Sequence, residues 1–322
     1  MKKLLFFLFL LFVPVSVEAA SSYAVVDAET GRVLMGEAEN DRFPIASLTK
    51  MWTALVAIEE GHLEDMVTVS KRAVYSEGSS IYLEEGQQIP LEELLYGLML
   101  RSGNDAATAI AEHVGGSEEG FVKLMNDKAV LHGLSGTTFT NPSGLHHEEH
   151  LATAADTARM LQIAMKNETF RKIASTVIYK GSKTTWQNKH KLLSQNIGAV
   201  AGKTGYTKVA GRTLATYFER GDKAFVVVTI NESNDWETHR FIADAIDQRY
   251  ESYTLVEKGE YLIPNATIAI EKPITLLLTA QERGHIEHML IAQRDYKRAI
   301  WHVKLNDDIL FSTRVSIKED KG

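Results

Sequence analysis

Three short segments carry the residues that could do chemistry in this chain. In order they are Ser47-Leu48-Thr49-Lys50, Ser102-Gly103-Asn104 and Lys203-Thr204-Gly205. A serine hydroxyl attacks a carbonyl carbon only when a neighbouring base takes its proton. A lysine acts as that base when burial or a second cation lowers its pKa. The segments therefore supply the parts of an acyl-transfer site that needs neither histidine nor metal.

The spacing within each segment suits a distinct task. Ser47 and Lys50 are three residues apart at a predicted helix start, so they share one face of the helix. The amide N–H of Ser47 could serve an oxyanion hole, with the positive end of the helix behind it. Ser102 and Asn104 fall in a loop between two helices, where a hydroxyl can relay a proton and an amide can orient Lys50.

The third segment precedes a β-rich region. Lys203 is the candidate second cation, and with Thr204 it could hold a substrate carboxylate, while Gly205 lets a peptide lie close to the strand edge. Each segment alone is a weak signal, because the same residues also occur at an ordinary capped helix start, in a polar loop or around a solvated lysine. A second Ser-x-Asn, Ser194-Gln195-Asn196, illustrates this. The order of all three is what favours a shared site.

The first residues indicate export. Met1-Lys2-Lys3 is followed by an apolar run to Val13 and by small residues, which predicts a signal peptide over residues 1–19, cut after Ala19. An uncleaved membrane anchor is the alternative, although the apolar run is short for a span. The chain has no cysteine, which excludes disulfides and thiolate chemistry, and its net charge of −7 argues against nucleic acid as a partner. We expect an exported protein of the cell-wall space or periplasm.

Hydrophobic periodicity predicts an α+β chain. Strands flank a glycine-containing turn at 27–31, and β-rich stretches at 213–218 and 223–231 are joined by a second hairpin. Between them we expect a mostly helical region, with helices at 46–60, 91–100, 105–114, 118–132 and 153–166, and a further helix at 236–250. An antiparallel sheet covered by helices follows. We predict a catalytic domain over 20–255 and a small β-rich accessory domain over 256–322.

These motifs resemble those of the penicillin-binding D-alanyl-D-alanine carboxypeptidases of the low-molecular-mass class, serine peptidases of the S11 type. The likeness covers residues 22–253 and includes flanking segments. They are Pro44 to Met51, Gly78-Ser79-Ser80, Leu98 to Ala107, Thr140 to Leu145 and Lys203 to Thr207. It implies a fold like that of β-lactamases and transpeptidases. The stretches 96–116 and 229–236 look like the sporulation-associated members.

The resemblance also implies roles for matching residues. Ser47 is acylated by the penultimate D-Ala of a peptidoglycan stem peptide, Lys50 is the general base, and Ser102 and Asn104 assist. Substrate binding falls to Lys203, Thr204, Gly205 and Tyr206, with the N–H groups of Ser47 and Tyr206 as the oxyanion hole. β-Lactams are implied as covalent inhibitors of Ser47. No cofactor and no metal is expected.

Three features depart from the family pattern or remain open. Some members have an arginine after the last sheet strand that binds the substrate carboxylate, and Arg240 is the nearest candidate here. The chain ends at Thr313 to Gly322 without the amphipathic membrane helix of many members, so we expect no clear membrane anchor after signal cleavage. His146, His147 and His150 cluster beside two glutamates, and we interpret them as a solvated loop in preference to a metal site.

Other activities use the same motifs. A D,D-endopeptidase that cuts cross-links is the main alternative to a carboxypeptidase. A serine β-lactamase is a weaker one, because the Glu-x-x-Leu-Asn segment that carries its deacylating carboxylate is missing between the second and third motifs. A non-enzymatic penicillin-sensing domain is disfavoured by the intact catalytic residues.

Overall fold

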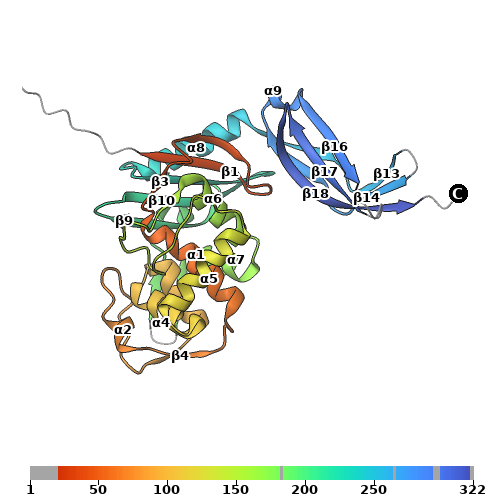
Figure 1. Cartoon of the computed structure of the whole chain (residues 1–322). Coiled ribbons are helices and arrows are strands. Elements are labelled where there is room, and N and C mark those ends of the chain that lie inside the picture. The colour runs from red at the N-terminus through yellow and green to blue at the C-terminus, as the bar shows by residue number, and fades with distance from the viewer. Residues whose placement is uncertain (1–20, 182–183, 264–265, 293–297, 320–322) are drawn as a thin grey trace, which may run out of the picture.

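The computed structural model describes residues 21–181, 184–263, 266–292 and 298–319. The predicted signal peptide, residues 1–19, lies outside them. Figure 1 shows a larger unit of sheet and helices and a second, β-rich unit formed by the last part of the chain. The predicted α+β class, an antiparallel sheet with helices on its faces, is confirmed.

A five-stranded antiparallel sheet in the order β2-β1-β11-β10-β9 forms the frame of the larger unit. Its strands come from both ends of the unit: β1 (Ser22–Asp27), β2 (Val33–Glu37), β9 (Ala199–Thr207), β10 (Gly211–Arg220) and β11 (Lys223–Ile230). Because strand side chains alternate, each strand faces two cores. Val25 and Val227 are paired across β1 and β11 and pack toward α8 (Asp235–Arg249), while Ala24 and Val228 pack into the main helical core.

The main core lies between the sheet and the helical region. Its central helix is α1 (Thr49–Glu60), whose residues 49–57 are all buried and which packs against helices from several parts of the chain. The helices of this region are α2 (Lys71–Val74), α3 (Leu91–Tyr96), α4 (Asn104–Gly115), α5 (Glu118–Leu131), α6 (Ala154–Ala164) and α7 (Glu168–Ala174). Gly61 ends α1 as predicted. Short turns η1 (Ala46–Leu48), η2 (Gly97–Arg101) and η3 (Lys191–Ser194) complete the set.

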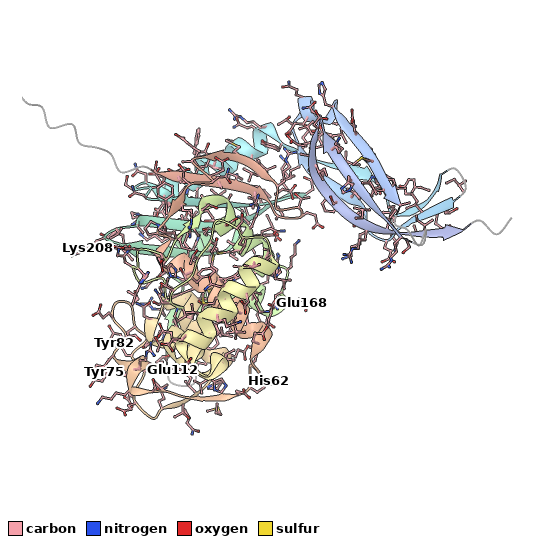
Figure 2. All side chains as sticks on the ribbon, in the orientation of Figure 1. His62, Tyr75, Tyr82, Glu112, Glu168 and Lys208 are labelled. Carbon is pink, nitrogen blue, oxygen red and sulfur yellow. The ribbon has the colours of Figure 1, made fainter. Side chains whose placement is uncertain are left out.

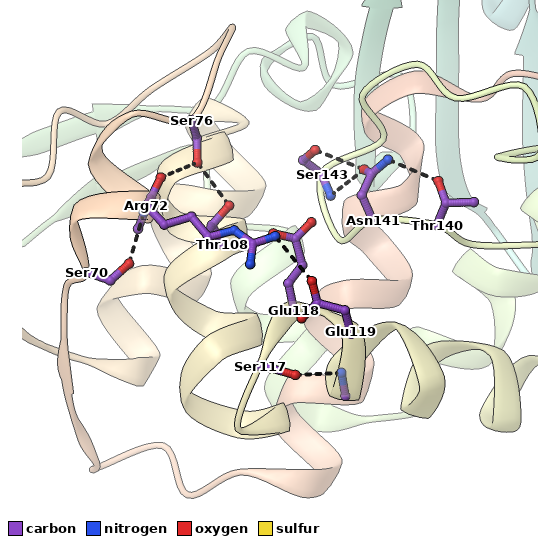
Figure 3. Close-up of polar contacts among 12 residues, drawn as sticks. Ser70, Arg72, Ser76, Thr108, Ser117, Glu118, Glu119, Thr140, Asn141 and Ser143 are labelled. Atoms are coloured by element: carbon purple, nitrogen blue, oxygen red, sulfur yellow. Dashed lines mark hydrogen bonds and ion pairs between the residues drawn. The ribbon is translucent and has the colours of Figure 1, made fainter.

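Three small two-stranded ladders tie the loops of this unit together. They are β3 (Arg42–Phe43) with β6 (Ala152–Thr153), β4 (Met66–Thr68) with β5 (Gln88–Pro90), and β7 (Ile178–Lys180) with β8 (Thr185–Gln187). A side-chain bond between Ser76 and Thr108, shown in Figure 3, ties the segment after α2 to α4. These links hold the loops that surround the three motifs.

The C-terminal unit is built almost entirely of strands. One sheet has the order β13-β14-β18-β17-β16, and β12 pairs with β15 beside it. The elements are β12 (Glu251–Val256), β13 (Gly259–Ile263), β14 (Ala266–Ile270), β15 (Ile274–Leu278), α9 (Ala280–Arg283), β16 (Ile286–Ala292), β17 (Arg298–Leu305) and β18 (Asp308–Glu319). The domain boundary predicted at 255 stays a prediction and falls inside β12. No helix in the described part of the chain is long and apolar enough to cross a membrane.

Candidate active site

The fold brings all three motifs to one cavity of about 320 Å³ at the free edge of β9, between the sheet and the helical region. Ser47, Ser102, Thr204, Gly205 and Tyr206 line it. These residues come from η1, from the loop before α4 and from β9, so only tertiary folding unites them. The predicted clustering of the three segments is visible in the structure.

Ser47 lies in η1, a single tight turn directly before α1. The preceding residue, Ala46, has a left-handed backbone with φ of 49°, a conformation that costs free energy and is common at functional sites. We predicted one continuous helix from Ala46. The helix instead begins at Thr49, and the tight turn ahead of it directs the Ser47 hydroxyl toward the cavity.

Lys50 is fully buried, and its Nζ has three oxygen neighbours. They are Oγ of Ser47 at 3.0 Å, Oδ1 of Asn104 at 2.6 Å and the carbonyl of Ser143 at 2.5 Å. Burial, followed by the positive charges of Lys203 and Lys189, holds the pKa of Lys50 well below its usual range, against a smaller opposing effect of Asp105. A neutral Lys50 amine within hydrogen-bond distance of Ser47 is the arrangement that a general base requires.

Ser102 and Asn104 are presented by a break in the helix. The α-helix predicted over 91–100 is shorter in the structure, where α3 ends at Tyr96. The chain continues as the π-helical turn η2 and leaves the helical conformation at Ser102, whose φ is 66°. Asn104 then starts α4 with its side chain buried, and its Nδ2 donates to the carbonyl of Glu77. Because the amide nitrogen is held there, the amide oxygen is fixed toward Lys50.

Lys203 lies on β9 and is buried, with Nζ donating to the carbonyl of Thr204 at 2.9 Å. Burial and then the positive charge of Lys189 lower the pKa of Lys203 to about 7. Lys50, Lys203 and Lys189 therefore form a cluster of mutually repelling amines. Such a cluster favours loss of a proton from the most buried member and attracts an anionic group.

The segment Thr140 to Leu145, which stood out in the sequence only as part of the family resemblance, supplies the third oxygen to Lys50. Asn141 accepts hydrogen bonds from the backbone N–H of Ser143 and of Gly144 and shapes a turn, as Figure 3 shows for Asn141 and Ser143. Gly144 has φ of 81°, and a Cβ atom there would lie 1.9 Å from the carbonyl oxygen of Ala46. The sequence Asn-Pro-Ser-Gly indicates a turn, but it does not indicate that the turn contacts Lys50.

The interpretation of His146, His147 and His150 as a solvated loop is wrong for His150. His150 is buried, its Nδ1 accepts from the N–H of Thr140, and its Nε2 therefore carries the hydrogen that points to Oγ1 of Thr49 at 2.8 Å. Burial, with smaller electrostatic effects of His147, Lys50 and His146, lowers the pKa of His150 to about 4. Among the described residues, no cluster of histidine, cysteine or carboxylate side chains is suited to hold a metal ion.

The arginine that lines the cavity is Arg212 on β10, which sequence reasoning did not single out. Its guanidinium is 2.6 Å from Oδ1 of the buried Asp235 and lies over the ring of Trp236. Arg240 is not among the cavity residues; its guanidinium pairs with Glu237 and Gln195 on the surface. Register explains the difference, because Arg212 pairs with Tyr206 and so shares the sheet face of Tyr206 and Thr204.

Fold and site together define a serine acyl-transfer enzyme of the Ser/Lys type. Residues 13–234 match the family model for D-alanyl-D-alanine carboxypeptidases, peptidase family S11. The chain belongs to this family.

Named relatives agree with the match. The D-alanyl-D-alanine carboxypeptidase DacF of Bacillus subtilis is 34% identical over 75% of this chain and 65% of its own length. DacB2 of Mycobacterium tuberculosis is 33% identical over 67% of this chain and 76% of its own. The chain thus spans slightly under two thirds of the Bacillus relative.

Solved structures have the same architecture. Penicillin-binding protein 5 of Haemophilus influenzae superposes with a TM-score of 0.77 over 93% of this chain and 96% of that one. At 22% sequence identity this likeness shows a shared fold and no more. A D-alanyl-D-alanine carboxypeptidase of Mycobacterium tuberculosis has a TM-score of 0.65 at 31% identity, covering 69% and 89% of the two chains.

Proposed function

We propose that this protein is a serine-type carboxypeptidase that removes the terminal D-Ala from peptidoglycan stem pentapeptides through an acyl-enzyme on Ser47. The observation that carries the proposal is the 3.0 Å contact between Nζ of the buried Lys50 and Oγ of Ser47, at a cavity lined by Ser47, Thr204 and Lys189. The family membership and the named relatives support the substrate class.

The residues suit each chemical step. Lys50 takes the proton of Ser47, whose Oγ bonds to the carbonyl carbon of the penultimate D-Ala while the N–H groups of Ser47 and Tyr206 bind the oxyanion. The C–N bond then breaks, and the leaving D-Ala takes a proton relayed through Ser102. Water, deprotonated by Lys50, attacks the ester and frees Ser47. Asn104 fixes Lys50, and Lys203, Thr204 and Arg212 hold the terminal carboxylate.

β-Lactams would acylate Ser47 and leave slowly. Among the described residues that line the cavity, Asp235 is the only carboxylate, and its bond to Arg212 keeps it from serving as a base for rapid deacylation. Asp105 is also occupied, since it accepts from the N–H groups of Ile81 and Leu83. This disfavours a β-lactamase. We further infer export by the predicted signal peptide, and we propose a role in sporulation from the likeness at 96–116 and 229–236.

Two assays on the purified protein test the proposal, each with Ser47→Ala as the blank. One measures D-Ala release from a diacyl peptide ending in D-Ala-D-Ala, and the other follows labelling by a fluorescent penicillin. We expect the blank to lose both signals by more than about 10³-fold, as for other nucleophile deletions. A wild type that neither releases D-Ala nor labels would disprove the proposal, and rapid penicillin turnover would point to a lactamase.

A further inference from the structure

A chain of buried polar side chains joins β10, β11 and α8. Oγ1 of Thr216 on β10 lies between two imidazole rings, 2.9 Å from Nε2 of His190 and 2.8 Å from Nδ1 of His239. Nε2 of His239 is in turn 3.1 Å from Oγ1 of Thr229 on β11. All four residues are buried, and we call them the histidine network.

The neighbouring atoms fix which nitrogens carry the hydrogens. The carbonyl of Ala215 can only accept and is 3.2 Å from Nε2 of His190, so this nitrogen carries the hydrogen. Thr216 then accepts from His190 and donates to Nδ1 of His239, which leaves the hydrogen of His239 on Nε2, directed at Thr229. The network therefore requires two neutral imidazoles. Burial is the largest cause that lowers the pKa of both histidines, and it lowers that of His190 to about 4.

The network holds the first turn of α8. His239 lies about one turn after Asp235 and Trp236, so the three residues share one side of the helix. The ring of His190 meets the ring of Trp236 edge-on, with 5.4 Å between their centres. Both histidines therefore act on the same turn, His239 through its bonds to the strand hydroxyls and His190 through the Trp236 ring.

The same turn supports the guanidinium of Arg212. Asp235 lies 2.6 Å from this guanidinium, and the centre of the Trp236 ring lies 5.9 Å from it. Arg212 and Thr216 are four residues apart on β10 and so project from the same face of the sheet. A shift of α8 along this face would move Asp235 and Trp236 together. The position of the guanidinium at the cavity thus depends on how α8 is fixed to β10 and β11.

The network is an expensive way to attach a helix. Nδ1 of His190 is buried and has no hydrogen-bond partner among the described residues, which is rare and calls for an explanation. The next turn of α8 attaches through ordinary apolar packing, by Ile242 and Ala243. Directional bonds specify one arrangement of the elements they join, whereas apolar contacts tolerate small shifts. The polar attachment lies at the turn that carries Asp235 and Trp236.

We propose that His190 and His239 are positioning residues for the substrate carboxylate. Through Thr216 they fix the first turn of α8, and this turn holds Arg212 where it meets the terminal carboxylate of the peptide. The inference rests on the function proposed above, in which Arg212 binds that carboxylate.

The test removes the hydroxyl that both histidines share. In Thr216→Val we expect KM for a diacyl D-Ala-D-Ala peptide to rise roughly 10-fold with kcat changed less than about twofold, since binding of the anion is weakened and the chemistry at Ser47 is not. The same peptide with an amidated C-terminus should be cleaved as by the wild type. Thr216→Ser keeps the hydroxyl and should restore KM. Thr157→Val is the matched control, at a buried threonine on α6 whose hydroxyl donates to the carbonyl of Thr153.

A double variant separates positioning from general damage. Because the network acts through Arg212, Arg212→Gln/Thr216→Val should have the KM of Arg212→Gln within about twofold. If Thr216→Val does not fold, Thr229→Val replaces it in both experiments, since it removes the other hydroxyl that holds His239. Long-range ¹H–¹⁵N NMR of the wild type at pH 7 reads the tautomers directly, and both histidines should carry the hydrogen on Nε2.

The outcomes separate this inference from the proposed function. Additive losses in the double variant, or equal losses on the free and amidated peptides, would overturn the positioning role alone. A hydrogen on Nδ1 of His239 would overturn the network itself, whatever the activity. A wild type that releases no D-Ala and takes no penicillin label would overturn the proposed function, and the positioning role with it.

Discussion

Gly205 on β9 lies directly against the backbone nitrogen of Ser47: a Cβ atom at Gly205 would stand 3.0 Å from that nitrogen and 2.3 Å from Oγ1 of Thr213. The glycine therefore sets how closely the edge strand approaches the nucleophile. This approach determines whether the N–H groups of Ser47 and Tyr206 can meet on one oxyanion. The sequence predicts that Gly205 lets a peptide lie close to the strand edge; in the structure Gly205 also sets the spacing between β9 and Ser47.

The first prediction follows from this contact. Gly205→Ala should displace β9 from η1 and lower the rate of Ser47 acylation by penicillin roughly 10-fold or more, because misplacement of reacting groups is costly. Stopped-flow or gel-based labelling measures the rate. Gly259→Ala is the matched control, since a Cβ there meets no atom within 4 Å and the site is far along the chain. Equal acylation rates in the two variants would contradict the spacing role.

The second prediction concerns the pH dependence of acylation. Ser47 is activated by neutral Lys50, whose pKa is lowered by burial and then by the charges of Lys203 and Lys189. Lys189→Gln removes one of these charges, so the pKa of Lys50 should rise. The acidic limb of the acylation profile should then move to higher pH, while Lys191→Gln, an exposed lysine two residues on, leaves it unchanged. An unmoved limb in Lys189→Gln would show that this charge does not act on the base.

The third prediction concerns stability in acid. The pKa of His150 is about 4 in the folded protein, mainly through burial, against 6.5 for the free side chain. As the pH falls below 6.5 the unfolded chain takes up the proton first, so stability is lost between pH 6.5 and 4. One such shift is worth about 3 kcal/mol. Buried His190, with a pKa also lowered by burial to about 4, adds to the same loss.

His150→Gln isolates this contribution. Urea unfolding at pH 7 and pH 4.5 should show a smaller loss of unfolding free energy in the variant than in the wild type, since glutamine does not titrate there. His62→Gln, at an exposed histidine labelled in Figure 2, serves as the control and should match the wild type. If His150→Gln loses as much stability as the wild type over this interval, the buried neutral state of His150 is not what the acid disrupts.

How much the sequence could predict depends on the range of the interaction. The pairing of Ser47 with Lys50 follows from helical spacing, and Gly61 as a helix end follows from local conformational preference. Both features could therefore be predicted from the sequence. The contact of Lys50 with the Ser143 carbonyl could not be predicted, because every residue has a backbone carbonyl and the residue type does not show which one approaches the lysine. His150 illustrates a second limit, since a polar loop composition does not show that one member folds inward onto Thr49.

Arg212 shows a third limit, which is strand register. A one-residue shift between β9 and β10 would turn its side chain to the other face of the sheet. The observed register pairs Arg212 with Tyr206 and Leu214 with Thr204, which places the guanidinium beside the cavity. Because the sequence does not give that register, Arg240 on α8 was named as the candidate to bind the substrate carboxylate.

The last prediction tests Arg212 as the ligand of the substrate carboxylate. The guanidinium is held by Asp235 at 2.6 Å and by the Trp236 ring, yet its side chain remains 43% exposed and has free N–H groups for an anion. Arg212→Gln should lower kcat/KM for a diacyl D-Ala-D-Ala peptide by roughly 10-fold to 100-fold, the range for a lost charge-assisted pair. The same peptide with an amidated C-terminus should be cleaved equally by variant and wild type, because its carboxylate is gone. Arg240→Gln should change neither substrate, since Arg240 pairs with Glu237 away from the cavity. An equal loss on both peptides in Arg212→Gln would mean that the arginine supports the sheet edge and does not bind the substrate anion.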